Sequence, residues 1–209
     1  RVLGTHSQII HNNWKLYAEN VRDSYHATLL HTFYTTFKVN RLDMDGGIIL
    51  SDRKWHHISY SKRATLEAST EYLQAEVHSA QYGSELDGPE LLKAWEGFDD
   101  QITHSIQTIF PTLVVQLTLN SLAVRFFVPR GVDKTELFWI YLGYEGDTPE
   151  QEKMRVMQGN LTGAAGLVAL EDGCINSFVQ RGIRGSDDKS SFIEMGGKTA
   201  ESNESSRAT

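Results

Sequence analysis

Alternating hydrophobic and polar positions dominate the middle of the chain and predict β-strands there. Residues 113–129 hold two apolar runs with Asn120 and Ser121 between them, where a hairpin turn is expected. Residues 130–133 make a second turn, and residues 135–144 continue the alternation as a third strand. Because strands that follow one another through short polar turns pair antiparallel, this region predicts a meander.

Helical spacing replaces the alternation in the N-terminal segment. We expect a kinked helix over residues 14–30, because apolar residues recur there at intervals of three and four. These residues are Trp14, Tyr17, Ala18, Val21 and Tyr25. The two large aromatic side chains, Trp14 and Tyr17, are expected in the core. Residues 1–12 carry no clear pattern.

The segments between this helix and the meander carry weaker signals. Residues 32–50 look extended, and the Asp-Gly-Gly sequence at 45–47 predicts a turn between two strands. Residues 54–60 are expected to form the next strand. Short helical patterns follow at 64–77 and 91–98.

Helix signals return after the meander. Thr148 is the expected N-cap and Pro149 suits the first turn, so a helix should run from there through Leu161. Residues 174–184 continue as helix, whereas residues 185–209 are polar and rich in Gly and Ser, which predicts a loop or a disordered tail. The order of elements predicts an α+β fold, a twisted antiparallel sheet flanked by helices.

Length and composition fit one domain over residues 1–209, and the lack of an initial Met indicates a fragment of a larger subunit. The net charge of −7 argues against nucleic acid or an anionic membrane as a partner, since both select basic patches. No apolar run is long enough for a membrane span. A single cysteine, Cys174, excludes an internal disulfide and fits a cytoplasmic protein; we expect it in the core, not on a metal.

Two histidines, His26 and His31, lie five residues apart, and Asp23 precedes the first by three. An imidazole pair beside a carboxylate is a common start for a transition-metal site. Five steps of an ideal helix place the two rings about 140° apart, so one ion can bind both only where the segment is irregular or a helix ends. The spacing alone favours two ordinary half-buried histidines. His56 and His57 are adjacent, so we expect them to be structural or pocket-lining.

The surrounding residues change that balance. The pattern Asn-Trp-Lys-Leu-x-x-Glu-Asn-x-x-Asp-x-Tyr-His-x4-His at residues 13–31 closely resembles the mononuclear-iron segment of Rieske non-haem iron oxygenases, the large subunits of ring-hydroxylating dioxygenases. The resemblance implies that His26 and His31 bind iron and that Asp23 links the iron to the Rieske cluster of a neighbouring subunit. It also implies a third ligand, a carboxylate far downstream.

A second motif supplies that carboxylate. Gly163 and Gly166 are followed by the acidic pair Glu171 and Asp172, and in the family the second acid of this pair binds iron. The resemblance therefore implies Asp172 as the third ligand, with a helix-capping or surface acid as the alternative. It implies further residues around the iron or the pocket: Asn20, Tyr25, Leu167 and Val168.

Two imidazoles and one carboxylate suit Fe(II) that must bind O2 beside a substrate, although zinc takes the same ligands. A Rieske [2Fe–2S] centre needs two Cys and two His, so this chain cannot hold one. The resemblance therefore implies that the cluster lies on a domain absent from this chain. It also implies electrons from NAD(P)H through a separate reductase or a ferredoxin, and a homotrimer or an α3β3 assembly with a helix-grip-like catalytic domain.

The segment from Tyr17 to His31 looks most like the branch that acts on salicylate or anthranilate, which implies a carboxylated single-ring aromatic substrate. Arg22 and Arg125 are candidates to pair with the substrate carboxylate, although a structural or surface role is favoured for each. Two alternatives stay open. One is an oxygenase for another aromatic class, and the other is a non-catalytic module of similar fold that binds an apolar ligand.

Overall fold

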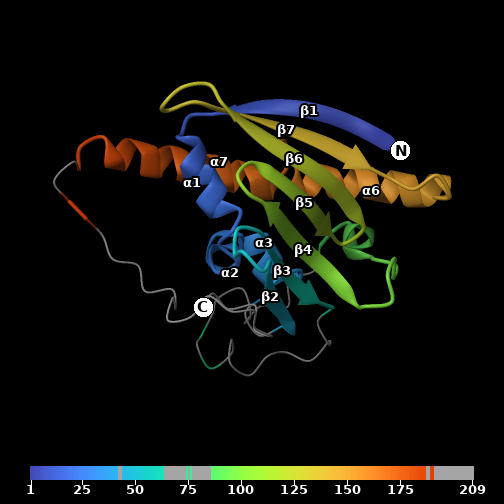
Figure 1. Ribbon diagram of the computed structural model, residues 1–209. Coiled ribbons are helices and arrows are strands. Elements are labelled where there is room, and N and C mark those ends of the chain that lie inside the picture. The colour runs from blue at the N-terminus through green and yellow to red at the C-terminus, as the bar shows by residue number, and fades with distance from the viewer. Residues whose placement is uncertain (42–43, 64–73, 75, 77–85, 187–188, 191–209) are drawn as a thin grey trace.

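The computed structural model describes residues 1–41, 44–63, 74, 76, 86–186 and 189–190. Within these residues lies a seven-stranded antiparallel sheet with the order β1-β7-β6-β5-β4-β3-β2 (Figure 1). Its strands are β1 (Val2–Ile10), β2 (Gly46–Leu50), β3 (His57–Lys62), β4 (Ile102–Ile109), β5 (Leu113–Thr118), β6 (Ser121–Pro129) and β7 (Thr135–Leu142). The helices are α1 (Trp14–Asn20), α2 (His26–Leu30), α3 (Thr32–Thr36), the 3-10 helix η1 (Pro89–Leu92), α6 (Pro149–Thr162) and α7 (Leu167–Ile183).

The predicted α+β class and the β5–β6–β7 meander are confirmed. The alternation does not reveal β1 or β4, because polar residues occupy positions on their inward faces. His104 and Thr108 of β4 are buried, and Gln8 of β1 is half-buried. A strand that buries polar groups loses the apolar-polar contrast from which strands are predicted.

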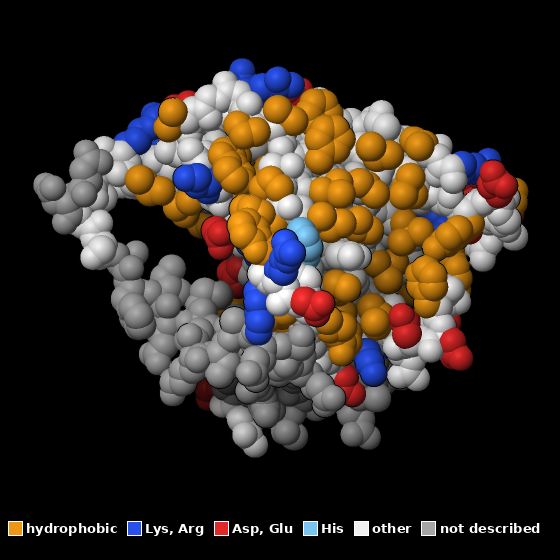
Figure 2. All heavy atoms as spheres, viewed as in Figure 1, with side chains coloured by type: hydrophobic (Ala, Val, Ile, Leu, Met, Phe, Trp, Pro, Cys, Tyr) orange, Lys and Arg blue, Asp and Glu red, His pale blue; other side chains and the backbone are white. Residues whose placement is uncertain are grey.

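The two faces of the sheet are covered differently. On one face, Val114, Phe127, Leu137 and Trp139 are buried and pack with Tyr17 of α1 in a single cluster. Helices α6 and α7 lie along this face (Figure 1). On the opposite face, half-buried apolar side chains alternate along β5, β6 and β7, and Figure 2 shows hydrophobic side chains gathered over these strands. The alternation of the meander thus separates a closed core from a partly exposed apolar surface.

The first 50 residues correct three predictions. Residues 14–30 form two helices instead of one kinked helix, because α1 ends at Asn20 and α2 begins at His26. Residues 32–36 form α3, not a strand. The expected turn at 45–47 is also wrong, since Gly46 and Gly47 begin β2. The irregular stretch between α1 and α2 is the break that a shared metal site requires.

The C-terminal helices differ from the prediction in extent and orientation. α7 begins at Leu167, well before residue 174. Its buried positions include the polar residues Asp172, Asn176 and Gln180, which follow one another at intervals of four. Cys174 is therefore exposed instead of in the core, on the side of α7 that faces solvent. A helix that turns a polar stripe inward must satisfy those groups with partners in the interior.

Two remaining expectations have partial outcomes. The helical pattern at 91–98 yields only η1, and the pattern at 64–77 lies almost wholly outside the described residues. Most of the predicted tail, residues 185–209, also lies outside them. In the part of the chain that the structure describes, every helix is too short or too polar to cross a bilayer.

The start of α6 gives a direct test of its capping box. Thr148 Oγ1 accepts from Gln151 N, while Gln151 Oε1 accepts from Thr148 N at 2.9 Å. We expect Thr148→Ala to lower the free energy of unfolding by about 1 kcal/mol, because it leaves helix N–H groups unpaired. Thermal denaturation should show a decrease in Tm of about 2–4 °C. Thr148→Ser, which keeps the acceptor, should retain most of the stability; an equal loss in both variants would contradict this role.

Candidate metal centre

Three side chains from distant parts of the sequence converge at the inner face of the sheet. His26 opens α2, His31 directly follows its last residue, and Asp172 lies one turn into α7. Asp172 Oδ1 lies 3.4 Å from His26 Nε2 and 3.3 Å from His31 Nε2. In the described part of the chain, these residues form the only group of three or more His, Cys, Asp or Glu side chains with ligand atoms close enough to share an ion.

The end of α2 explains how two histidines five residues apart come to face one point. His31 has φ −87° and ψ 80°, outside the helical region, so the chain leaves the helix at this residue. The two imidazole rings then lie 5.2 Å apart, centroid to centroid, in an edge-to-face arrangement. Of the two arrangements that the spacing allowed, the structure has both an irregular stretch before His26 and a helix end before His31.

Each imidazole is held through its other nitrogen. His26 Nδ1 donates to the backbone carbonyl of Asp23 at 2.5 Å, and His31 Nδ1 donates to Glu171 Oε2 at 2.7 Å. Because Nδ1 of each ring carries the hydrogen that these acceptors bind, Nε2 is the nitrogen that faces Asp172. The side chain of Asp23 also accepts from the backbone N–H groups of Tyr25 and His26, which shapes the turn before α2.

The geometry fits a small transition-metal ion. Metal–nitrogen and metal–oxygen distances of about 2.1 Å put ligand atoms at right angles about 3 Å apart. The two histidine-to-aspartate separations of 3.3 and 3.4 Å are close to this value. His31 and Asp172 are buried and His26 is half-buried, so most of the donor set is shielded from bulk water.

Without a metal, the close contact between His26 and Asp172 shifts the pKa values of both groups. Burial lowers the pKa of His26, but hydrogen bonds and charge from Asp172 and Asp23 outweigh burial and raise it to about 9. Burial raises the pKa of the Asp172 carboxyl, whereas its contacts with His26 and His31 bring it well below its usual range. A bound cation would take the place of the proton on His26 Nε2.

A pocket opens beside these ligands toward the sheet. Among its lining residues are Asn20, Val168, Arg125, His104 and Gln116. Burial, followed by the charges of His31 and Arg125, lowers the pKa of His104 to about 3, so this ring is neutral at physiological pH. The fixed positive charges among the lining residues are therefore those of Arg22 and Arg125.

Arg125 is 5% exposed and has few partners. Its Nη1 donates to Tyr17 Oη at 2.8 Å, and its guanidinium lies 4.9 Å from the centre of the Trp139 ring. Its Nε has no hydrogen-bond partner among the residues that the structure describes. Within the described residues no carboxylate lies within ion-pair distance of Arg125, which is unusual for a buried charge.

Other residues predicted to surround the iron or to bind the substrate have different outcomes. Tyr25 is 40% exposed and Leu167 is 55% exposed, and neither lines the pocket. Arg22 lines it but donates to the backbone carbonyl of Trp55 and covers the Phe110 ring. His56 and His57 make separate contacts with the chain, with Phe110 N and Thr108 respectively, and share no site.

Several residues around the three converging side chains were not identified from the sequence motifs. Glu171 directly precedes Asp172 and holds the ring of His31. Asn176 follows Asp172 by one helical turn and is buried beside it. His104 and Gln116 are polar residues at inward positions of β4 and β5, where the alternation calls for apolar ones. A polar residue at a predicted core position is the signal that could have identified them.

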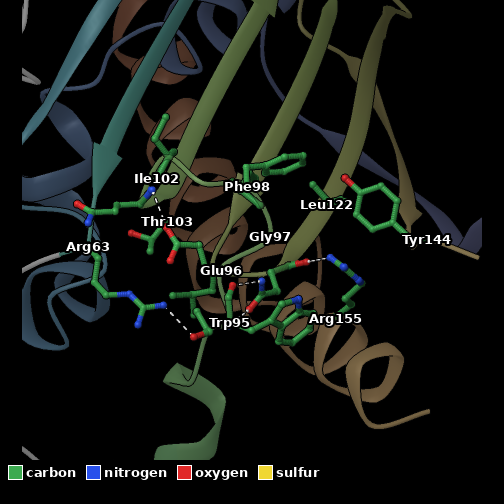
Figure 3. A pocket seen from close by; sticks show the side chains of 15 residues that line it. Arg63, Trp95, Glu96, Gly97, Phe98, Ile102, Thr103, Leu122, Tyr144 and Arg155 are labelled. Atoms are coloured by element: carbon green, nitrogen blue, oxygen red, sulfur yellow. Dashed lines mark hydrogen bonds between the residues drawn. The ribbon is translucent and has the colours of Figure 1, made fainter. Parts of the chain in front are cut away.

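A second cavity, of about 260 Å³, lies away from these ligands, between β4–β6 and the loop that follows η1 (Figure 3). Its buried charge is already paired, because Arg155 donates to Asp147 and to the backbone carbonyl of Asn120. Arg63 donates to the backbone carbonyl of Ala94. These contacts explain the charged lining as structural.

Comparison with known proteins identifies relatives over the whole chain. The sequence model of the family described as "Ring hydroxylating alpha subunit (catalytic domain)" matches residues 2–204. Terephthalate 1,2-dioxygenase, terminal oxygenase component subunit alpha 2, of Comamonas sp is 45% identical over 100% of this chain and 50% of its own length. The anthranilate 1,2-dioxygenase large subunit of Burkholderia cepacia is 39% identical over 92% of this chain and 46% of its own.

The large oxygenase component of salicylate 5-hydroxylase from Ralstonia sp is 32% identical over 94% of this chain and 47% of its own length. The chain thus spans about half the length of these relatives. The crystal structure of naphthalene 1,2-dioxygenase from Rhodococcus sp. bound to indole superposes with a TM-score of 0.68 at 16% identity, covering 100% of this chain and 53% of that one. That likeness supports the fold alone.

The raised pKa of His26 predicts that the stability of the metal-free protein depends on pH. The pKa of His26 is about 9 in the folded state, against about 6.5 when unfolded. A raised folded-state pKa stabilises below the unfolded value and loses that contribution as pH rises through 9. After chelation, Tm should therefore fall by several degrees between pH 6.5 and 9.5. His26→Gln should flatten this slope, and an equal slope in the variant would refute the assignment.

Proposed function

Because this chain belongs to the family of ring-hydroxylating alpha subunits and carries their catalytic domain, we propose that it uses O2 to hydroxylate a carboxylated aromatic ring at a mononuclear Fe(II) centre. The proposed iron ligands are His26, His31 and Asp172. The observation that carries the proposal is the convergence of their ligand atoms, all within 4.8 Å of one another. We also propose that the whole chain, residues 1–209, forms this one domain.

Ferrous iron held by two imidazoles and a carboxylate supplies the activation of O2. The residues of the chain prepare and shield that site. The carbonyl of Asp23 and the carboxylate of Glu171 fix the tautomers of the two imidazoles, which directs Nε2 of each to the ion. The sheet and α7 bury Asp172, so its negative charge is compensated by the ion instead of by water.

Arg125 is the proposed partner of the substrate carboxylate. A buried guanidinium without an anionic partner is costly, and a carboxylate in the pocket would supply the missing negative charge and could accept from the unpaired Nε–H. The three relatives support this class, because each is named for an aromatic ring that bears a carboxylate. The terephthalate enzyme is more similar to this chain than the anthranilate or salicylate enzyme, so we extend the proposed substrates to terephthalate-like acids.

The pocket itself is narrow, about 50 Å³. A cavity of about 150 Å³ is the size that accommodates a benzene ring, so side chains must move for an aromatic acid to enter. Arg22 is the proposed mobile group, because it lines the pocket and is held by a single backbone carbonyl and an aromatic face. The alternative of an apolar-ligand module is disfavoured by the polar wall of the pocket.

Electrons must reach the iron from outside this chain. We propose a Rieske [2Fe–2S] cluster on a neighbouring subunit, supplied from NAD(P)H by a reductase or ferredoxin in the cytoplasm, and a homotrimer or α3β3 assembly. Asp23 is the proposed link to that cluster. Its carboxylate is half-buried and lies 3.6 Å from His26 Nδ1, which places it between one iron ligand and the protein surface.

The metal assignment predicts which variants lose iron. We expect purified protein supplied with Fe(II) to bind about one ion per chain. His31→Gln and Asp172→Asn should each reduce this to below a tenth, because two remaining ligands hold the ion weakly. Iron content by plasma mass spectrometry is the measurement. His56→Gln is the matched control, since His56 is exposed and outside the centre; equal iron loss in the control, or none in the ligand variants, contradicts the assignment.

The role of Arg125 predicts selective loss of acidic substrates. We expect Arg125→Gln to lower kcat/KM for an aromatic carboxylate about 10- to 100-fold, because a charged hydrogen bond is lost. The corresponding carboxamide should lose much less. Turnover is measured with a reductase and a Rieske-containing partner. In Arg53→Gln the loss should stay below about threefold, because Arg53 is exposed and does not line the pocket; parallel losses for acid and amide would argue against the role of Arg125.

A further inference from the structure

Asn176 lies at the centre of a short chain of hydrogen bonds around Asp172. It is 5% exposed on α7, four residues after Asp172. Its Nδ2 donates to the backbone carbonyl of Asp172 at 2.9 Å and to Asn20 Oδ1 at 2.9 Å. Asn20 Nδ2 in turn donates to Asp172 Oδ1 at 3.2 Å.

This chain of bonds has only one consistent direction. A backbone carbonyl can only accept, so Asn176 must turn its NH2 group toward it. The second hydrogen of the same NH2 group then requires an acceptor, which fixes the oxygen of Asn20 toward Asn176. Asn20 is therefore left with its NH2 group facing the acceptor Asp172 Oδ1, so Asn176 and Asp172 together set the direction of its amide.

The amide nitrogen of Asn20 lies close to two of the three converging side chains. It lies 3.2 Å from Asp172 Oδ1 and 3.1 Å from His26 Nε2, which are two of the three converging ligand atoms. These separations are close to the spacing of about 3 Å between neighbouring ligand atoms of one ion. An amide oxygen at this point would be a ligand, because it carries lone pairs, whereas an amide NH2 group cannot bind a cation.

We propose that Asn176 is a positioning residue that keeps the oxygen of Asn20 turned away from the metal, so that the protein supplies three ligands and no fourth. The inference rests on the proposed function, in that it takes His26, His31 and Asp172 to bind the ion. It assigns to Asn176 the protection of an open coordination position, which O2 chemistry needs and a structural metal site does not.

Asn176→Asp tests the proposal with little change in shape. The new carboxylate accepts where Asn176 donates, so Asn20 should rotate and turn its oxygen to the metal. Water-proton relaxation of the Mn²⁺-loaded protein reports how many exchangeable waters the ion keeps. Three protein ligands leave three of six positions open, so the loss of one water should lower the metal-dependent relaxation by about a third. Asn160→Asp, which adds the same charge at an exposed position of α6, should leave it unchanged.

The double variant Asn20→Leu with Asn176→Asp separates positioning from a general disturbance. It removes the amide that would become the fourth ligand, so the relaxation should return to the wild-type value. Unchanged relaxation in metal-loaded Asn176→Asp overturns the proposal. So does a decrease that persists in the double variant, because it would not act through Asn20.

A metal-free measurement distinguishes failure of this inference from failure of the proposed function. Wild-type protein that takes up neither Mn²⁺ nor Fe(II) contradicts the proposed function. In chelated protein, Asn20→Leu and Asn176→Leu should lower Tm by amounts that are less than additive in the double variant, because both remove one shared bond. Strictly additive decreases overturn the link between the two amides, whether or not the protein binds metal.

Discussion

The buried carboxylate of Asp172 is the constraint on which the arrangement of this domain depends. A carboxylate out of contact with water must be paired or bound to a cation. Here two imidazoles face it, two amides surround it, and each of those groups has its own partner on another element. The break between α1 and α2, the helix end at His31 and the polar inward face of α7 all serve to bring partners to this one charge.

The inward-facing positions of the sheet differ from one part of the sheet to the other. On β6 and β7, the buried apolar side chains of Phe127 and Trp139 pack with Tyr17 in the core. Toward β4 and β5, the same face carries polar groups, of which His104 and Gln116 are buried. The boundary between the two regions is Arg125, which touches the aromatic core on one side and lines the pocket on the other. A single strand position thus links the stability of the core to the charge of the pocket.

The relatives show that the fold is retained at low sequence identity. The solved naphthalene dioxygenase shares the fold at only 16% identity, which is understandable because alternation and helix signals tolerate wide substitution. The three curated relatives are named for different aromatic acids while the chain is 32–45% identical to them. Proteins named for different aromatic acids are thus similar in sequence over nearly the whole of this chain.

The sequence by itself determined the α+β class, the β5–β6–β7 meander, the cap of α6 and, through two spaced motifs, the identity of His26, His31 and Asp172 as a group. These features depend on neighbouring residues or on a fixed spacing, so they can be recognised from the sequence. It did not determine β1 and β4, the separation of α1 from α2, or the inward polar face of α7. Those depend on which polar groups find partners across the fold: Asn176 and Glu171 acquire their roles only when α7 is laid against α1 and α2. Burial of a polar residue is settled by partners distant in the chain, and only the tertiary structure brings those partners together.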